Sequence, residues 1–321
     1  MKISIALATY NGAQFILAQL ESLRNQSLPP DEVIISDDCS TDGTADLIRN
    51  YISEWKLQNW CLLRNEENIG YIRNFRKALS LCTGDMILLC DQDDLWNKDK
   101  LRAMHGVMTG DGRITALASG YDMIDENNHR TQGLRRAFRE RKMVPPEKPY
   151  RIGGRILCGN VAPGCTCAYR KKLVEEYLGR EDAGGLPHDW ALNFLAFEQK
   201  GLFFLNHHLT SYRITGKNTI GALSEEDTCR KRKSTLLELS ENMQQVAMLS
   251  EEKQKYLQCA EFTAHRAKVA ETGEIRLFLQ GLSRYSPVLS PGRFLQYAKD
   301  YVVGRKLKKR GTAGKRKGDL Q

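Results

Sequence analysis

The feature that most constrains the fold is a recurring pattern in the first part of the chain: a short apolar run ends in polar side chains, and a stretch with helical periodicity follows. Residues 3–7 form the first apolar run, and residues 15–23 then place apolar side chains at helical spacing. A second run, 32–36, leads into the acidic and hydroxyl-rich segment 37–44. Alternating strands and helices predict an α/β fold with a mostly parallel sheet. Because nucleotides bind at the carboxyl ends of such strands, we expect the polar segments to converge at one edge of the sheet.

A third apolar run, 86–89, leads into the segment 90–96, which reads Cys-Asp-Gln-Asp-Asp-Leu-Trp. Carboxylates crowded at the end of a buried strand raise one another's pKa unless a cation or a ligand holds them. Hard cations such as Mg²⁺ and Mn²⁺ take oxygen ligands, commonly one or two carboxylates together with substrate phosphates. The segment therefore predicts a divalent metal that binds a diphosphate. The alternative from the residues alone is a solvated acidic turn.

Four segments together resemble the N-terminal half of the family 2 glycosyltransferases, in their order and in their spacing. They are Ala8-Thr9-Tyr10-Asn11, Asp37-Asp38-Cys39-Ser40-Thr41-Asp42-Gly43-Thr44, Asn68-Ile69-Gly70 and Asp91-Gln92-Asp93-Asp94. Within that family the chain is most similar to the bacterial rhamnosyltransferase-type enzymes of surface polysaccharide synthesis. The resemblance implies the GT-A fold of nucleotide-diphospho-sugar transferases, with a mostly parallel central sheet flanked by helices. Here that fold is followed by a C-terminal helical extension.

The resemblance also implies roles in binding the donor. Thr9 and Tyr10 lie against the nucleotide base in this interpretation, and Asp38 accepts a hydrogen bond from the imide N–H of uracil or thymine, since an ionised carboxylate only accepts. Asp91 contacts the ribose, and Asp93 coordinates the Mn²⁺ or Mg²⁺ that bridges the two phosphates. The residues expected to bind the nucleotide-sugar are Thr9, Tyr10, Asn11, Asp38, Gly70, Arg73, Asp91, Gln92, Arg213 and Lys217. For Arg73, a solvated helix face is the alternative.

Attack of an acceptor hydroxyl on a sugar carbon requires a general base, for which a carboxylate is the usual device. The resemblance implies that this base is Asp189, in Pro-His-Asp-Trp at the start of a helix expected over 190–199. From the residues alone, the alternative is that Asp189 is the N-cap of that helix. The residues expected on the acceptor side are Trp96, Gly164, Cys165, His188 and Trp190.

One segment departs from the family pattern. Residues 211–218 resemble a stretch that reads Tyr-Arg-Gln-His-Gly-x-Asn in relatives, but the Gln-His pair is missing here. Arg213 and Lys217 still provide cations for phosphate oxygens.

Length and charge predict two parts. We expect a catalytic domain over 1–222, with a nucleotide-binding half at 1–97 and an acceptor-binding half at 98–222, and a helical extension over 223–321. The stretch from Arg293 onward carries ten basic and two acidic residues, or +8 of the formal +9. This basic tail fits a helix on an anionic membrane surface, and it fits equally a packed helix followed by a solvated end. Nothing else resembles a nucleic-acid-binding module, so no nucleic-acid partner is expected.

The sequence also bears on location. No apolar run reaches the length of a membrane span, and there is no signal-peptide pattern. The nine cysteines lack Cys-x-x-Cys spacing, which fits reduced thiols. We therefore expect a cytoplasmic protein, or one held peripherally at the inner face of the plasma membrane.

These observations predict an inverting, metal-dependent glycosyltransferase. It moves a sugar from a UDP-sugar or dTDP-sugar to a hydroxyl of a bacterial surface glycan or a lipid-linked acceptor. The alternative is a non-catalytic adaptor of the same fold that binds a sugar nucleotide or a membrane surface. A nucleotidyltransferase is disfavoured, because residues 8–13 contain no Lys or Arg for a phosphate loop. The sequence does not determine the donor sugar, the acceptor or the oligomeric state.

Overall fold

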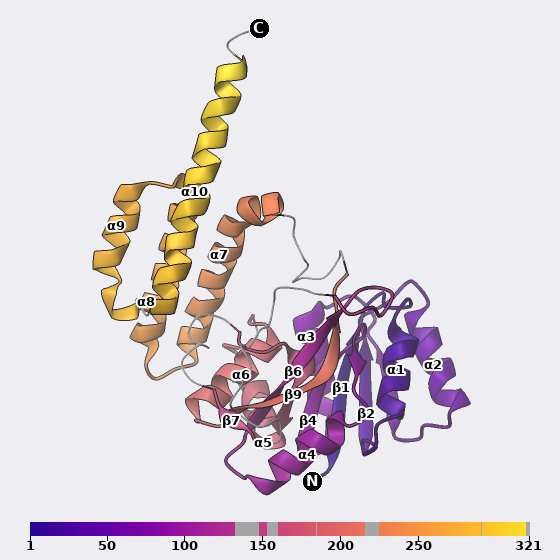
Figure 1. Cartoon of the computed structure of the whole chain (residues 1–321). Coiled ribbons are helices and arrows are strands. Elements are labelled where there is room, and N and C mark those ends of the chain that lie inside the picture. The colour runs from indigo at the N-terminus through magenta and orange to yellow at the C-terminus, as the bar shows by residue number, and fades with distance from the viewer. Residues whose placement is uncertain (132–147, 153–159, 184, 216–224, 290, 319–321) are drawn as a thin grey trace. The chain divides into compact units, whose positions relative to one another are not determined.

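The computed structural model describes residues 1–131, 148–152, 160–183, 185–215, 225–289 and 291–318 (Figure 1). The first part of the chain alternates strands and helices as predicted. Its elements are β1 (Ile3–Thr9), α1 (Ile16–Arg24), β2 (Glu32–Asp37), α2 (Thr44–Glu54), β3 (Trp60–Arg64), α3 (Tyr71–Leu81) and β4 (Met86–Asp91).

The elements that follow are less regular. They are β5 (Leu95–Trp96), α4 (Lys100–Gly110), β6 (Ala116–Ile124), β7 (Tyr150–Arg151), the 3₁₀ turn η2 (Gly164–Thr166), β8 (Cys167–Arg170), α5 (Lys171–Leu178), α6 (His188–Glu198) and β9 (Leu202–Arg213).

One sheet joins the described strands, in the order β3-β2-β1-β4-β8-β6-β9-β5, and β7 pairs with β9. The first four strands of this order are all parallel. Beyond β4 the sheet is mixed: β8 runs antiparallel to both β4 and β6, whereas β6 and β9 are parallel. Helices flank the central sheet (Figure 1), so the predicted fold class is confirmed, with antiparallel pairs added in its second half.

The parallel strands are apolar along nearly their whole length because helices cover both faces of the sheet. Ile3, Ile5 and Leu7 of β1 pack in one core cluster with side chains of α1, α2 and α4. Residues of opposite parity face α3, where Ser36 of β2 is hydrogen bonded to Asn74. The strands are thereby fixed in register, and their carboxyl ends are held at one edge.

The chain divides into two compact units, and the second contains the last four α-helices. They are α7 (Glu225–Met248), α8 (Lys253–Thr272), α9 (Ile275–Arg284) and α10 (Pro291–Gly318), with the 3₁₀ turn η3 (Ser286–Val288) before α10. Asp300 of α10 is fully buried and is paired with Arg232 of α7 and Arg266 of α8. This buried triad ties three helices together.

Close backbone contact also joins α8 to α10. Gly273 ends α8 in the left-handed region, with φ of +59°, and a Cβ there would lie 2.4 Å from the amide nitrogen of Arg305. Only glycine combines this φ with such an approach. Within the described residues, no helix is both long and apolar enough to cross a membrane.

Candidate active site

The site lies where β1, β2 and β4 end side by side. In the parallel register, Thr9 pairs with Asp37 and Ala8 pairs with Asp91, so the polar segments after the three strands meet at one edge. The convergence follows from the strand order and needs no long-range rearrangement of the chain. It places every segment of the sequence resemblance that follows these strands in one neighbourhood.

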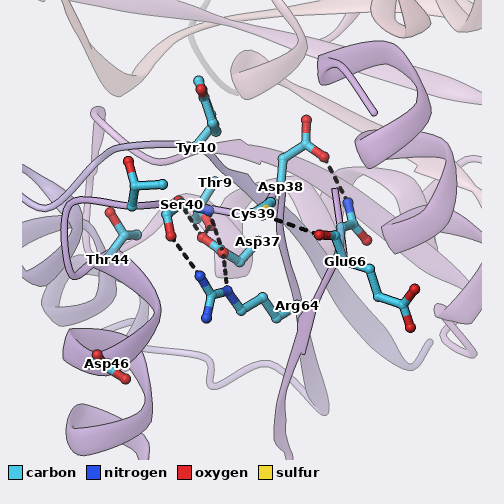
Figure 2. Close-up of polar contacts among 12 residues, drawn as sticks. Thr9, Tyr10, Asp37, Asp38, Cys39, Ser40, Thr44, Asp46, Arg64 and Glu66 are labelled. Atoms are coloured by element: carbon cyan, nitrogen blue, oxygen red, sulfur yellow. Dashed lines mark hydrogen bonds and ion pairs between the residues drawn. The ribbon is translucent and has the colours of Figure 1, made fainter. Parts of the chain in front are cut away.

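The carboxylate of Asp37 holds the start of the loop that follows β2 (Figure 2). Its buried carboxylate accepts hydrogen bonds from Thr9 Oγ1 at 3.0 Å, from Ser40 N at 3.0 Å and from Ser40 Oγ at 2.5 Å. Arg64 of β3 lies 3.7 Å from the same carboxylate and donates to the Ser40 carbonyl at 2.8 Å. The Thr9 hydroxyl is therefore used inside the protein, and Thr9 can offer a base only the rest of its surface.

Asp38 points away from Asp37 and fixes the turn before α3 (Figure 2). It is 2% exposed, and its Oδ1 accepts from Asn65 Nδ2 at 2.8 Å and from Ile69 N at 2.9 Å. Its Oδ2 accepts from Gly70 N at 2.9 Å, where φ is +83°. A carboxylate oxygen has two lone pairs, so Oδ2 keeps acceptor capacity for a ligand N–H.

Two buried asparagines that the sequence reasoning missed support Asp38. Asn65 donates to Asp38, and its own Oδ1 accepts from Lys77 Nζ at 2.7 Å. Asn74 of α3 accepts from Ser36 Oγ at 2.7 Å and from Asn65 Nδ2 at 3.0 Å. Asn65 directly follows β3, so it is a polar residue at a strand end, like the polar segments after β1, β2 and β4. Asn74 carried no local signal, because it lies inside a helix.

The main chain of Tyr10 is held by the side chain of Gln92. Gln92 accepts from the Tyr10 N–H at 2.8 Å and donates to the Tyr10 carbonyl at 2.9 Å, so one side-chain amide holds both polar groups. The ring of Tyr10 is exposed, which suits stacking on a base. Asn11, with φ of 48°, accepts from Thr41 N at 2.9 Å and thereby links the loops after β1 and β2.

Gly12 allows this arrangement. A Cβ on Gly12 would lie 2.2 Å from Gln92 Oε1, so any larger residue would push the Gln92 amide off the Tyr10 main chain. Asp42 completes the loop: it accepts from Thr44 N at 3.1 Å and from Ala13 N at 3.0 Å. Asp42 therefore joins the loop after β1 to the first residue of α2.

An acidic cluster follows β4. The oxygens of Asp91 and Asp94 and the sulfur of Cys165 all lie within 4.8 Å of one another. Burial raises the pKa of Asp91 well above its usual value, and the charges of Asp94, Asp93 and Asp189 raise it further. Burial, and then Asp93, raise the pKa of Asp94 to about 7. Like charges desolvated together require a counter-ion to ionise fully.

This donor set fits a divalent cation. Oδ2 of Asp94 is buried and has no hydrogen-bond partner among the described residues, and Asp94 shares its cluster with the carboxylate of Asp91. Burial raises the pKa of the Cys165 thiol well above its usual value, so the sulfur stays protonated and is a poor ligand for a hard cation. Asp91 and Asp94 are thus the pair that the structure brings together, whereas Asp93, the expected metal ligand, is not in this cluster.

Arg213, at the end of β9, holds the acidic loop from inside. It is 1% exposed, its backbone N–H donates to Asp94 Oδ1 at 2.9 Å, and its Nε donates to the Asp93 carbonyl at 2.6 Å. Its other guanidinium nitrogens donate to the Asp125 carbonyl and to Asn128 Oδ1, each at 2.7 Å. The guanidinium group of Arg213 is thus hydrogen bonded to acceptors within the protein. Direct contact of Arg213 with a phosphate would require these hydrogen bonds to break.

Asp189 lies in the first turn of α6. Its Oδ1 accepts from Trp190 N at 2.7 Å, and its Oδ2 accepts from Gly164 N at 3.0 Å. The N-cap of α6 is Pro187, and no side chain caps the helix there, so the interpretation of Asp189 as the N-cap is wrong. The charge of Asp189 contributes to the raised pKa of Asp91. Burial raises the pKa of Asp189 itself to about 6, against the opposing effect of those hydrogen bonds. A carboxylate with this pKa is suited to a general base near neutral pH.

Gly164 is needed for this contact. A Cβ on it would lie 3.0 Å from Leu89 Cδ1 and 3.1 Å from the Cβ of Asp189. The turn that contains Gly164 and Cys165 is thus wedged between β4 and α6.

Several residues expected on the acceptor side lie in the core. His188 is 6% exposed and stacks on Phe75 with 3.9 Å between ring centroids, and burial lowers its pKa to about 3. Trp96 and Trp190 are 5% and 4% exposed. These three rings are therefore too buried in this structure to contact an acceptor directly. Arg73 is exposed on α3, and Lys217 lies outside the described residues.

Comparison with known proteins agrees with this geometry. The profile of the family described as Glycosyl transferase family 2 matches residues 4–178, which is more than half of the chain. The chain belongs to this family. TuaG of Bacillus subtilis, named as a candidate teichuronic acid biosynthesis glycosyltransferase, is 38% identical over 99 residues, which are 31% of this chain and 38% of TuaG.

TarS of Staphylococcus aureus, a poly(ribitol-phosphate) β-N-acetylglucosaminyltransferase, is 36% identical over 104 residues. That match covers 32% of this chain and 18% of TarS, so the chain spans well under two thirds of the length of these two curated relatives. Residues 1–349 of TarS also share its fold, with a TM-score of 0.60 at 19% identity over 98% of this chain and 92% of that one. The predicted family and the GT-A fold are therefore confirmed.

Proposed function

We propose that this family 2 protein is an inverting, metal-dependent glycosyltransferase. It transfers a hexosyl or rhamnosyl group from a UDP-sugar or dTDP-sugar to a hydroxyl of a bacterial surface glycan or a lipid-linked acceptor. One observation carries the proposal: Asp91 lies in a cluster with Asp94, and the charges of both Asp94 and Asp189 raise the pKa of Asp91. A site for the leaving diphosphate and a base for the acceptor thereby occupy one centre.

The donor site is assigned to the loops after β1, β2 and β4. The exposed ring of Tyr10 offers a stacking surface, and Asp38 keeps acceptor capacity for an imide N–H. Both uracil and thymine carry that group. TarS has been crystallised with UDP-GlcNAc, and its fold matches this chain with a TM-score of 0.57 at 18% identity over 96% of this chain and 92% of that one, which supports a uridine donor. Asp91 is assigned to the ribose or to the metal.

Asp91 and Asp94 would hold Mn²⁺ or Mg²⁺, and Asp93 is a further candidate on the same loop. A metal ion bound there supplies charge stabilisation to the diphosphate as it departs. A mannosyltransferase of Pyrobaculum calidifontis, crystallised with GDP-Man and Mn²⁺, has a related fold, with a TM-score of 0.51 at 16% identity over 96% of this chain and 86% of that one. Asp91 and Asp94 are the carboxylates whose mutual repulsion such a cation would relieve.

Asp189 takes the proton of the acceptor hydroxyl in this mechanism. The hydroxyl oxygen attacks the anomeric carbon, the bond from that carbon to the diphosphate oxygen breaks, and the nucleoside diphosphate leaves with the electron pair. A single displacement inverts the configuration, and it needs one base and no carboxylate nucleophile. The hydrogen bond from Gly164 keeps Asp189 oriented during the step.

Names of relatives support a surface polymer as the acceptor, since they include teichuronic acid biosynthesis and poly(ribitol-phosphate) modification. We place the reaction at the cytoplasmic face of the membrane, where lipid-linked acceptors are built. The basic residues at the end of α10 would hold the protein to anionic lipids there, each contributing about 1 kcal/mol.

The test is a panel of UDP-sugars and dTDP-sugars with and without Mn²⁺, read as thermal stabilisation and as release of nucleoside diphosphate. A ligand at a hundred times its Kd adds about 2.7 kcal/mol to the free energy of unfolding. We expect one donor to stabilise the protein only with Mn²⁺. The variants Asp91→Asn and Asp94→Asn are expected to lose that stabilisation, and Asp189→Ala to keep it while losing transfer. Binding without turnover across acceptors would instead favour a non-catalytic adaptor, and no binding at all would refute the proposal.

A further inference from the structure

Lys100 is a cation in a place where the fold does not require one. It is the first residue of α4 and is fully buried. A helix N-terminus disfavours positive charge, and burial of an ammonium group away from water is costly. Burial lowers the pKa of Lys100 to about 8, so the side chain is still charged at neutral pH. A cation that persists against both effects is held by specific partners.

Those partners belong to two distant segments of the chain. Lys100 Nζ donates to the carbonyl oxygen of Cys165 and, at 3.0 Å, to Thr210 Oγ1 of β9. Thr210 Oγ1 in turn donates to the same Cys165 carbonyl at 3.3 Å. The third side of the ammonium faces the Trp96 ring, 3.6 Å from its centroid. Lys100 and Thr210 therefore grip one peptide group, that of Cys165.

This peptide group joins the two halves of the proposed centre. The thiol of Cys165 borders the carboxylates of Asp91 and Asp94. The preceding residue, Gly164, donates its N–H to Asp189. Movement of the Cys165 carbonyl would shift both the wall of the acidic cluster and the hydrogen bond that orients the base.

We propose that Lys100 is a positioning residue of the transferase centre: through the Cys165 carbonyl, its ammonium group fixes the 164–165 turn that holds Asp189 beside the acidic cluster. This inference rests on the proposed function for its link to catalysis. The positioning of the turn itself can be measured without a substrate. A buried lysine that serves stability alone would not act on this turn in particular.

The variant Lys100→Met removes the charge and the donors but keeps an unbranched apolar side chain. The Cys165 carbonyl keeps the Thr210 hydroxyl as a donor, so we expect some loss of stability and a protein that still folds. Thr210→Val is the second variant, because it removes the hydroxyl that bridges Lys100 and Cys165 and keeps the charge. Lys171→Met is the matched control: Lys171 is the first residue of α5, but its side chain is 42% exposed.

Amide hydrogen exchange of the free protein is the first measurement. In Lys100→Met we expect the amides of 164–166 to exchange about tenfold faster, with α4 unchanged, and in Thr210→Val a smaller change at the same amides. Lys171→Met is expected to match the wild type. Wild-type exchange at 164–166, or uniformly faster exchange throughout the unit, would overturn the proposal.

Kinetics with the donor found in the panel is the second measurement, read as released nucleoside diphosphate. Misplacement of a catalytic group by about 1 Å costs about a hundredfold in rate, so we expect kcat of Lys100→Met to fall by at least tenfold at an unchanged donor KM. If the wild type turns over no donor, the proposed function fails but the exchange result stands. If the wild type is active and Lys100→Met keeps its kcat, the positioning role is wrong.

Discussion

Substitution of Gly12 by alanine tests how the exposed ring of Tyr10 is held. The new Cβ would lie 2.2 Å from Gln92 Oε1 and 2.4 Å from Gln92 Cδ, so the flexible side chain of Gln92 must move away. The two hydrogen bonds from the Gln92 amide to the main chain of Tyr10, at 2.8 and 2.9 Å, are then lost. A net hydrogen bond contributes about 0.5–1.5 kcal/mol, and these two are near the surface. We therefore expect Gly12→Ala to lower the free energy of unfolding by about 1–2 kcal/mol.

An opposing effect must be separated from this loss. Gly→Ala restricts the unfolded chain and stabilises a compatible site by about 0.4–1 kcal/mol. Gly112→Ala measures that effect, because a Cβ on Gly112 meets no atom within 4 Å and its φ lies outside the left-handed region. Urea denaturation of both variants gives the difference due to Gln92.

A double-mutant cycle makes the reasoning refutable. In the Gln92→Ala background nothing opposes the new methyl group, so Gly12→Ala should no longer be destabilising there. UDP affinity in the presence of Mn²⁺ should fall about fivefold to tenfold in Gly12→Ala and in Gln92→Ala, with no further loss in the double variant. Free energies that add within about 0.5 kcal/mol would show that Gly12 and Gln92 act independently, and the account of Tyr10 would be wrong.

Three further predictions concern titration and burial. Burial raises the pKa of Asp189 to about 6, and the base must be ionised, so kcat/KM should fall about tenfold for each pH unit below 6 and level off above pH 6. A flat profile from pH 5 to 7 would argue against Asp189 as the base. Asp300→Asn should destabilise the helical unit by about 3 kcal/mol, because it leaves Arg266, which is 7% exposed, without its buried counter-charge, and urea denaturation followed by circular dichroism would detect this. His188→Phe should change the free energy of unfolding by less than about 1.5 kcal/mol and leave transfer intact. The buried imidazole stacks on Phe75, and its Nδ1 has no hydrogen-bond partner among the described residues, so a phenyl ring can replace it. Loss of transfer in a folded variant would restore an acceptor role for His188.

Much of the donor half could be predicted because its signals are local. The three predicted apolar runs, 3–7, 32–36 and 86–89, became β1, β2 and β4 with limits within a few residues of those expected, whereas β3 was not predicted. Short connections through single helices leave such strands few alternatives to a parallel arrangement. The gathering of Thr9, Asp37 and Asp91 at one edge then follows from the register.

The second half was harder because its pairings join distant segments. β8 inserts between β4 and β6, and β9 pairs with β5 more than a hundred residues earlier in the chain. No local pattern encodes such neighbours. No local pattern therefore predicted that Lys100 would donate a hydrogen bond to the Cys165 carbonyl, or that Arg213 would donate to the carbonyls of Asp93 and Asp125.

Local sequence patterns were enough to predict the family, the strand-helix alternation and the edge of the sheet where the polar segments gather. Which side chains face that edge depends on contacts between distant segments. The tertiary structure grouped Asp91 with Asp94 rather than with Asp93, buried Trp96, His188 and Trp190, and recruited Asn65 and Asn74 behind Asp38. The physical reason is that the ends of apolar runs are set by neighbouring residues, whereas the direction and burial of a side chain depend on segments that only the completed fold brings against it.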